Sequence, residues 1–218
     1  MKAKSISYFY AMISTQHILL FIFLLLWCFF HSSLISNPFI SYIKPKLGKH
    51  FRTYRILYNL FSLITFLPLV WYSYSIKSEM IFSWPGNFML VRVLILLLCF
   101  YLFFAGSRSY DLSSFLGFRQ IQQKEHHKTM SDDGNISTAG ILGVIRHPWY
   151  TATFLFIWAR NLDSAALIVN ATFSIYLIVG CYLEEKKLVL EYGEQYRMYK
   201  KNVSILFPWK WLKTKLKR

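Results

Sequence analysis

Charged and aromatic side chains gather in one stretch of an otherwise apolar chain, between Gly140 and Pro208. Arg146 and His147 stand directly before Pro148, which suits the first turn of a helix because its missing N–H costs little there. The free backbone N–H groups at a helix start favour anions, and an arginine can grip a carboxylate with two parallel hydrogen bonds. This turn therefore predicts a binding site for an anionic ligand group.

A pair of carboxylates, Glu184 and Glu185, ends the second of two apolar segments that follow this turn. Acidic residues at a helix C-terminus oppose the helix dipole, so a nearby cation is needed to justify them. Arg146 is one candidate for that cation, and the ammonium group of a ligand is another.

Apolar and aromatic residues then recur at helical spacing: Leu188, Tyr192, Tyr196 and Tyr199. This spacing predicts an amphipathic helix that packs on the rest of the protein, and the tyrosine rings also offer π faces to a cation.

The sequence shows none of the common motifs of soluble enzymes. It contains no G-x-G-x-x-G motif and no P-loop, and no Ser-His-Asp, Cys-His or metal-ligand spacing stands out. Cys28, Cys99 and Cys181 lie inside apolar segments, where they read as small hydrophobic residues. A site made of Arg, His, aromatic and Glu side chains suits binding and positioning better than nucleophilic catalysis, and no metal site is predicted.

The elements that position these residues are long apolar segments. The 218 residues are 55% hydrophobic with a mean hydropathy of +0.35, which is too apolar for an ordinary soluble domain. A hydrocarbon core of about 30 Å needs about 20 apolar residues per helix. Five segments are candidates: 16–30 with its flanks, 56–76, 88–106, 149–159 and 165–183. The fourth is short, so its helix either begins before Pro148 or enters the bilayer only partway.

These segments predict an all-α fold, a polytopic integral membrane protein with about five transmembrane helices in a single membrane domain, residues 1–218. The first three helices occupy residues 1–106, and a cytoplasmic loop spans residues 107–145. The last two helices form a hairpin that, with a cytoplasmic amphipathic helix after it, occupies residues 146–208.

The net charge of +15 raises the question of a nucleic-acid partner, but the charge distribution points to topology instead. The loop 32–55, the loop 107–150 and the C-terminal tail carry five, five and ten of the 25 lysines and arginines. Five spans place all three on one side, and positive charge favours the cytoplasm. We therefore expect the N-terminus outside and the C-terminus in the cytoplasm, with membrane lipid as the partner and no nucleic acid.

Taken together, the motifs of the second half resemble a known family. They are Arg146-His147-Pro148-x-Tyr150, Glu184-Glu185-x-x-Leu188, Tyr192-Gly193-x-x-Tyr196-x-x-Tyr199 and Pro208. This pattern, over about the last 70 residues, is similar to the isoprenylcysteine carboxyl methyltransferase and phospholipid methyltransferase superfamily of integral-membrane enzymes. The first half resembles its branch of NnrU-like proteins and methanethiol S-methyltransferases, through His31-Ser32-Ser33-Leu34, Tyr54-Arg55-x-x-Tyr58-Asn59 and Phe118-Arg119-Gln120.

The resemblance implies a pocket for S-adenosylmethionine, made by Arg146, His147, Pro148, Tyr150, Glu184, Glu185, Tyr196 and Tyr199. Arg146 and Glu185 are the residues predicted to be catalytic. The carboxylate of the cofactor is expected at Arg146, and its ammonium or ribose hydroxyls at Glu184 or Glu185. Methyl transfer from a sulfonium needs little acid–base help, so holding the two reactants at attack distance supplies much of the acceleration.

The methyl acceptor stays open among an isoprenylcysteine carboxylate, a small thiol and a lipid amine. An amine must lose a proton before it attacks, and no base other than His147 is evident in this stretch. A thiol or carboxylate of a small or lipophilic substrate is therefore favoured. The alternatives are a phospholipid amine N-methyltransferase, an NnrU-like non-catalytic accessory protein and, less favoured, a nicotinamide-dependent reductase. The oligomeric state is not predicted.

Overall fold

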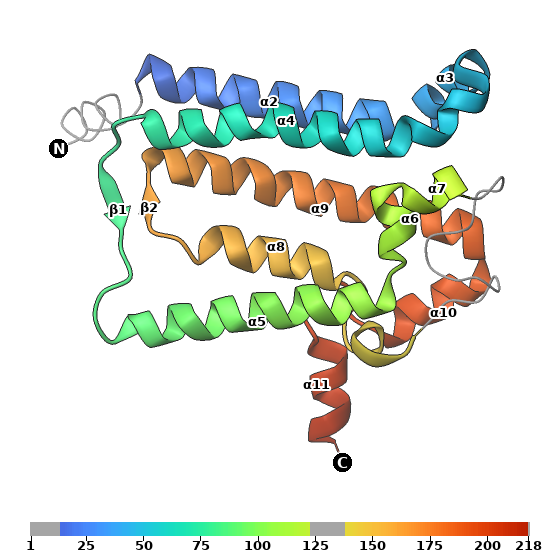
Figure 1. Ribbon diagram of the computed structural model, residues 1–218. Helices are drawn as coiled ribbons and strands as arrows, with labels where there is room; N and C mark the ends of the chain where they lie inside the picture. Colours follow the sequence, from blue (N-terminus) through green and yellow to red (C-terminus); the bar gives the residue numbers. More distant parts are fainter. Residues whose placement is uncertain (1–13, 123–137, 218) are drawn as a thin grey trace, which may run out of the picture. The chain divides into compact units, whose positions relative to one another are not determined.

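The computed structural model describes residues 14–122 and 138–217, and it confirms an all-α fold (Figure 1). The α-helices are α2 (Thr15–Ile35), α3 (Asn37–Leu47), α4 (Tyr54–Ser75), α5 (Phe88–Ser109), α6 (Leu112–Leu116), α7 (Phe118–Gln122), α8 (Pro148–Trp158), α9 (Ser164–Tyr192), α10 (Glu194–Asn202) and α11 (Trp209–Leu216). Two 3-10 helices, η1 (Gly48–Thr53) and η2 (Gly140–Gly143), and two short strands, β1 (Met80–Phe82) and β2 (Leu162–Asp163), complete the described elements.

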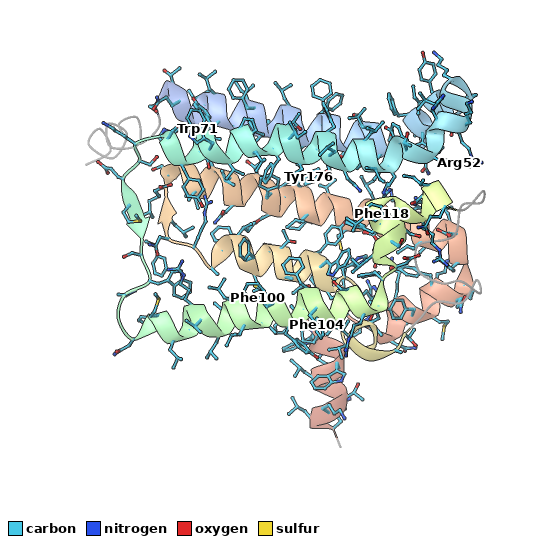
Figure 2. The ribbon with its side chains drawn as sticks, viewed as in Figure 1. Arg52, Trp71, Phe100, Phe104, Phe118 and Tyr176 are labelled. Carbon is cyan, nitrogen blue, oxygen red and sulfur yellow. The ribbon has the colours of Figure 1, made fainter. Side chains whose placement is uncertain are left out.

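Four helical stretches of the described chain are long and apolar enough to cross a membrane: Thr15–Ile35, Asn37–Ser75, Phe88–Ser109 and Ser164–Tyr192. Large apolar side chains such as Trp71 on α4 and Phe100 on α5 are exposed, as expected of surfaces that face lipid (Figure 2). The remaining apolar segment forms α8, which begins at Pro148 and has 11 residues. At 1.5 Å per residue α8 is about 16 Å long, about half the thickness of the hydrocarbon core.

The chain forms two compact units, and the boundary falls within α9. The first unit consists of Met1–Trp84 and Arg160–Tyr176, and the second of Pro85–Ala159 and Leu177–Arg218. In the first unit the two strands pair antiparallel, and Leu20, Leu24, Ile76 and Ala165 form the buried apolar cluster.

The polar motifs of the first half contact one another inside the first unit. The Trp27 ring stacks on His31, with 4.6 Å between the ring centres. The hydroxyls of Ser62 and Tyr58 lie 3.1 Å and 3.0 Å from Nδ1 and Nε2 of His31, and Tyr54 donates to the carbonyl of Leu34 at 2.6 Å. Hydrogen bonds of this kind hold helices together in a bilayer, so these motifs join α2 to α4.

Within the second unit α5 and α8 lie side by side (Figure 1), packed around Leu102, Ile145 and Ala152. The closest approach is at Gly106, because a Cβ built there would lie 2.5 Å from Nε1 of Trp149. The same indole N–H donates to the carbonyl of Phe103 at 3.1 Å. Only a residue without a side chain leaves room for this contact.

We therefore expect Gly106→Ala to lower stability by about 1–3 kcal/mol, the usual cost of overpacking a well-filled site. Gly180 on α9 is the matched control, because a Cβ there would meet the Tyr150 ring at an ordinary 3.5 Å. Gly180→Ala should be neutral or stabilising by up to about 1 kcal/mol, since alanine favours the helix. Thermal unfolding in detergent compares the two variants, and equal melting temperatures would refute the expected close contact.

The structure corrects the predicted boundary at Glu184 and Glu185. Helix α9 does not end there but continues to Tyr192, so the carboxylates do not face the helix C-terminus as expected. The predicted continuous amphipathic helix is also wrong, because Gly193 has a φ of 57° and separates α9 from α10. Glycine adopts this left-handed backbone readily, which explains why the helix stops at this position.

Candidate functional site

Arg146, His147 and Glu185 meet in the interior of the second unit, where they are 6%, 2% and 3% exposed. Nε and Nη2 of Arg146 donate to the two oxygens of Glu185 at 2.8 Å and 3.0 Å, a bidentate ion pair. Nε2 of His147 lies 2.9 Å from Oε1 of Glu185. Because an ionised carboxylate only accepts hydrogen bonds, this contact assigns the proton to Nε2 of His147.

Two residues of α10 complete the contacts of this carboxylate. Tyr196 donates its hydroxyl to Oε1 of Glu185 at 2.8 Å, and Nζ of Lys200 lies 3.0 Å from Oε2. We call Arg146, His147, Glu185, Tyr196 and Lys200 the Glu185 cluster. A carboxylate offers about four lone-pair positions, so the five contacts of Glu185 use its full capacity for accepting hydrogen bonds.

The backbone beside the cluster fastens the turn before α8 to the segment after α10. Ile145 and Ser204 form a parallel bridge. The N–H groups of Arg146 and His147 donate to the carbonyls of Ser204 and Ile205 at 2.9 Å and 3.1 Å. Buried backbone groups need such partners, so this pairing fixes where the side chains of the turn point.

Side chains reinforce the same attachment. Nη1 of Arg146 donates to the carbonyls of Val203 and, at 3.2 Å, Lys200. Tyr199 donates to the carbonyl of Leu142 at 2.7 Å, and Tyr110 donates to the carbonyl of Arg146 at 3.2 Å. The guanidinium therefore holds α10 as well as Glu185, and it makes four hydrogen bonds from its five N–H groups in doing so.

Burial keeps the phenols of this region protonated. It raises the pKa of Tyr196, and the Glu185 carboxylate that accepts its hydrogen bond raises that pKa further. Burial likewise raises the pKa of Tyr110 and of Tyr199. Each hydroxyl therefore remains a hydrogen-bond donor at neutral pH.

The raised pKa of Tyr196 leads to an expected loss of stability at alkaline pH. The folded state holds this proton more tightly than the unfolded state does. The contribution is therefore complete below the ordinary phenol pKa of about 10 and falls as the pH rises above it. We expect the melting temperature of the wild type to fall more steeply than that of Tyr196→Phe between pH 9 and pH 11. Parallel curves for the two proteins would contradict this coupling.

All eight predicted site residues lie in the second unit, but most of them are buried. Pro148 begins α8 in the interior, and Tyr196 and Tyr199 belong to an apolar cluster with Leu188 and Val203. The exceptions are Tyr150, which is half-buried, and Glu184. The structure pairs Arg146 with Glu185. Of the two cations predicted to lie near the carboxylates, Arg146 and a ligand ammonium, Arg146 is therefore the one that the structure places beside Glu185.

Glu184 and Tyr150 border the Glu185 cluster and remain accessible. The Glu184 side chain is 40% exposed, and its carboxylate lies 3.8 Å from Nδ1 of His147, too far for a hydrogen bond. The Tyr150 ring stands nearly perpendicular to the His147 ring, with 5.4 Å between their centres. Lys200 is also accessible, with a side chain that is 38% exposed. A ligand that reaches the cluster therefore meets a carboxylate, an aromatic ring and an ammonium group.

Lys200 and Tyr110 lie outside the sequence motifs that predict the site. Lys200 follows Tyr196 by four residues and so lies on the same face of α10. This spacing is the feature of the sequence that could have placed Lys200 in the site. Tyr110 follows the end of α5 and has no spacing that relates it to Arg146.

The motif at residues 118–120 makes local contacts. Arg119 pairs with Asp111, and Gln120 donates to the carbonyl of Ser114 at 2.9 Å. Hydrogen bonding from Ser114 lowers the pKa of Asp111 to about 2, with the Arg119 side chain acting in the same direction. This motif therefore ties α6 to α7.

Comparisons with known proteins identify a family and several relatives that are similar over part of the chain. A family model described as NnrU protein matches residues 16–212. The methanethiol S-methyltransferase of Pseudomonas deceptionensis is 39% identical over 77 residues, which is 35% of this chain and 29% of that protein. Methanethiol S-methyltransferase 1 of Bradyrhizobium diazoefficiens is 40% identical over 67 residues, 30% of this chain and 24% of that protein.

A third relative, the methanethiol S-methyltransferase of Crocosphaera subtropica, is 33% identical over 97 residues, 42% of this chain and 36% of that protein. The chain thus spans only 24% to 36% of the length of these relatives. No solved structure is a significant match. Because the family model covers the chain from the start of α2 into α11, this all-α integral membrane protein belongs to the NnrU family.

Proposed function

We propose that this protein is a membrane-bound methyltransferase that binds S-adenosylmethionine beside the Glu185 cluster. One observation supports this most: a buried ion pair fixes the turn before α8, α9 and α10 together while leaving Glu184 and Tyr150 accessible at its edge. The similarity to parts of proteins named methanethiol S-methyltransferases supports the same reaction class.

The accessible side chains fit the charges of S-adenosylmethionine. Glu184 is suited to its ammonium or ribose hydroxyls, and the Tyr150 ring offers a π face to a sulfonium. Lys200 is suited to its carboxylate, because the Lys200 side chain is 38% exposed, whereas Arg146 is buried. The proposal therefore moves the direct contacts from Arg146 and Glu185 to residues beside them.

S-adenosylmethionine brings an electrophilic methyl group, so the protein does not have to supply a nucleophile. The Glu185 cluster instead holds three separate chain segments in one geometry, which keeps Glu184 and Tyr150 in place. Positioning of this kind is what methyl transfer requires, because effective molarity alone accounts for about 7–11 kcal/mol in favourable cases. Arg146 and Glu185 are accordingly positioning residues in this proposal.

A thiol or carboxylate remains the proposed acceptor. His147 is buried, and its Nε2 proton is bonded to Glu185, so it is badly placed to take a proton from an amine. A carboxylate is already an anion, and a thiol is more acidic than an ammonium group. The arrangement of His147 therefore argues against the phospholipid amine alternative.

Calorimetry on the purified protein in nanodiscs tests the proposal. We expect S-adenosylmethionine and S-adenosylhomocysteine to bind, and we expect labelled methyl transfer to a small thiol or an isoprenylcysteine but not to a lipid amine. Absence of binding by folded protein would refute the proposal and favour the accessory role considered from the sequence. Thermal unfolding of the same sample establishes that the protein is folded.

We also propose that Glu184 and the C-terminus face the cytoplasm, where S-adenosylmethionine is made available to the enzyme. The basic loops and tail support this orientation. A reporter fused after Arg218 that is active only outside the cytoplasm should stay silent, whereas a cytoplasmic reporter at the same place should be active. The opposite pattern would reverse the orientation and exclude cytoplasmic entry of the cofactor.

A further inference from the structure

Helix α11 carries a basic and apolar surface that the proposed methyl transfer does not use. We define the α11 surface as Trp209, Lys213, Lys215, Leu216 and Lys217, all of which are exposed. Trp209 is 57% exposed and Leu216 is 86% exposed. The chain has no Asp or Glu after Glu194, so the charge of this surface is positive throughout.

The α11 surface combines cations with aromatic rings at close range. Nζ of Lys213 lies 5.4 Å from the centre of the Trp209 ring, and Nζ of Lys215 lies 5.9 Å from that of Trp211. Trp209, Leu212 and Leu216 follow one another at spacings of three and four residues, so they share one face of the helix. Tryptophan, leucine and lysine in this arrangement are typical of a helix lying in the membrane interface.

The direction of α11 agrees with this placement. Within the second unit α11 runs across the axis of α5, and it extends away from α5 beside the C-terminal half of that helix (Figure 1). Since α5 is long and apolar enough to cross the membrane, a helix that runs across its axis lies parallel to the membrane plane, as an interfacial helix does.

The first turn of α11 is connected to the Glu185 cluster. Nζ of Lys210 donates to the carbonyls of Lys200 and Lys201 at 2.6 Å and 3.0 Å, and its backbone N–H donates to the hydroxyl of Ser204 at 2.9 Å. The carbonyl of Lys200 also accepts from Nη1 of Arg146 at 3.2 Å. One carbonyl therefore links the start of α11 to the buried arginine.

We propose that the α11 surface binds the anionic head groups of the bilayer and that this binding stabilises α10 and the Glu185 cluster through Lys210. The occupant is a lipid surface because rings and leucines are interleaved with the lysines and the helix lies across α5. A soluble polyanion would use the lysines alone and leave the apolar face in water.

The expected effect follows from the lysines. Each lysine close to an anionic surface contributes about 1 kcal/mol, which is about fivefold in a binding equilibrium. Lys213, Lys215 and Lys217 together should then favour the bound helix by about 100-fold at low salt. Salt screens such attraction, so the effect should shrink as the ionic strength rises.

Hydrogen exchange of the full chain in nanodiscs tests this proposal. We expect amides of residues 209–216 to exchange about 10- to 100-fold more slowly in discs that contain phosphatidylglycerol than in phosphatidylcholine discs. The protection should disappear in the triple variant Lys213→Gln/Lys215→Gln/Lys217→Gln. The triple variant Lys44→Gln/Lys46→Gln/Lys49→Gln removes the same charge from the first unit and should keep the protection.

A second variant tests the connection to the cluster. Lys210→Met should retain the lipid-dependent protection of residues 212–216 but lose the lipid-dependent protection of α10. Equal protection of α11 in both lipids would overturn lipid binding, as would protection by soluble heparin with none by phosphatidylglycerol. Unchanged protection of α10 in Lys210→Met would overturn the connection.

Discussion

Arg146→Met is expected to destabilise the folded protein by about 3–5 kcal/mol, the usual cost of removing one partner from a buried ion pair. The variant keeps the approximate volume of the side chain but leaves the Glu185 carboxylate buried without its bidentate partner. It also removes the donor to the carbonyls of Lys200 and Val203. Lys200 and His147 still contact the carboxylate, so unfolding should remain cooperative although the midpoint falls.

An exposed ion pair on the same unit gives the matched control. Arg197 and Glu194 on α10 lie 3.1 Å apart, with side chains that are 60% and 66% exposed. Pairs of this kind contribute at most about 1 kcal/mol, so Arg197→Met should hardly change stability. Denaturant unfolding in mixed micelles, followed by circular dichroism, compares the two variants. Similar losses for Arg146→Met and Arg197→Met would contradict the assignment of Arg146 to a buried, coupled pair.

The double variant Arg146→Met/Glu185→Met separates the ion pair from the other contacts. If the unpaired carboxylate causes most of the loss, removing it as well should restore part of the stability, as in other buried pairs replaced by apolar residues. Restoration should be incomplete, because Tyr196 and His147 then lose their shared acceptor. If the double variant lost more unfolding free energy than the two single variants lose together, the cluster would act mainly through its backbone contacts.

The sequence predicts the apolar elements well because their signal is local. Long runs of apolar residues alone indicate α2, α5 and the apolar part of α9, and the structure confirms these helices. The C-terminal end of α9 is harder to predict from the sequence. Charged residues such as Lys186 and Lys187 are good helix formers, so α9 continues past Glu185. The helix stops only where Gly193 takes a left-handed backbone.

The choice between the two carboxylates depends on the face of α9. Cys181, Glu185 and Leu188 are buried and recur at spacings of four and three residues, so they share one face. Glu184 is rotated from that face by about 100°, since a helix has about 3.6 residues per turn. The spacing was therefore present in the sequence. What the sequence lacked was the position of Arg146, which depends on the pairing of Ile145 with Ser204.

Glu184→Gln is expected to weaken S-adenosylmethionine binding strongly while leaving the unliganded protein as stable as the wild type. The proposed charge-assisted hydrogen bond to the ammonium or ribose contributes about 1.5–3 kcal/mol, which corresponds to about 10- to 150-fold in affinity. Stability should hardly change, because the Glu184 side chain is 40% exposed and makes no hydrogen bond to His147 at 3.8 Å. Calorimetry measures the affinity, and melting without ligand measures the stability.

Two further substitutions on α9 make this result specific. Glu191→Gln removes the same charge at an exposed position next to the last residue of the helix, and it should change neither quantity. Glu185→Gln should lower the melting temperature of the unliganded protein, because it neutralises the buried partner of Arg146. If Glu184→Gln bound the ligand as tightly as Glu191→Gln does, Glu184 would have no part in the site. If Glu185→Gln weakened binding without any loss of stability, the carboxylate would contact the ligand directly, and the saturated ion pair would have to open when the ligand binds.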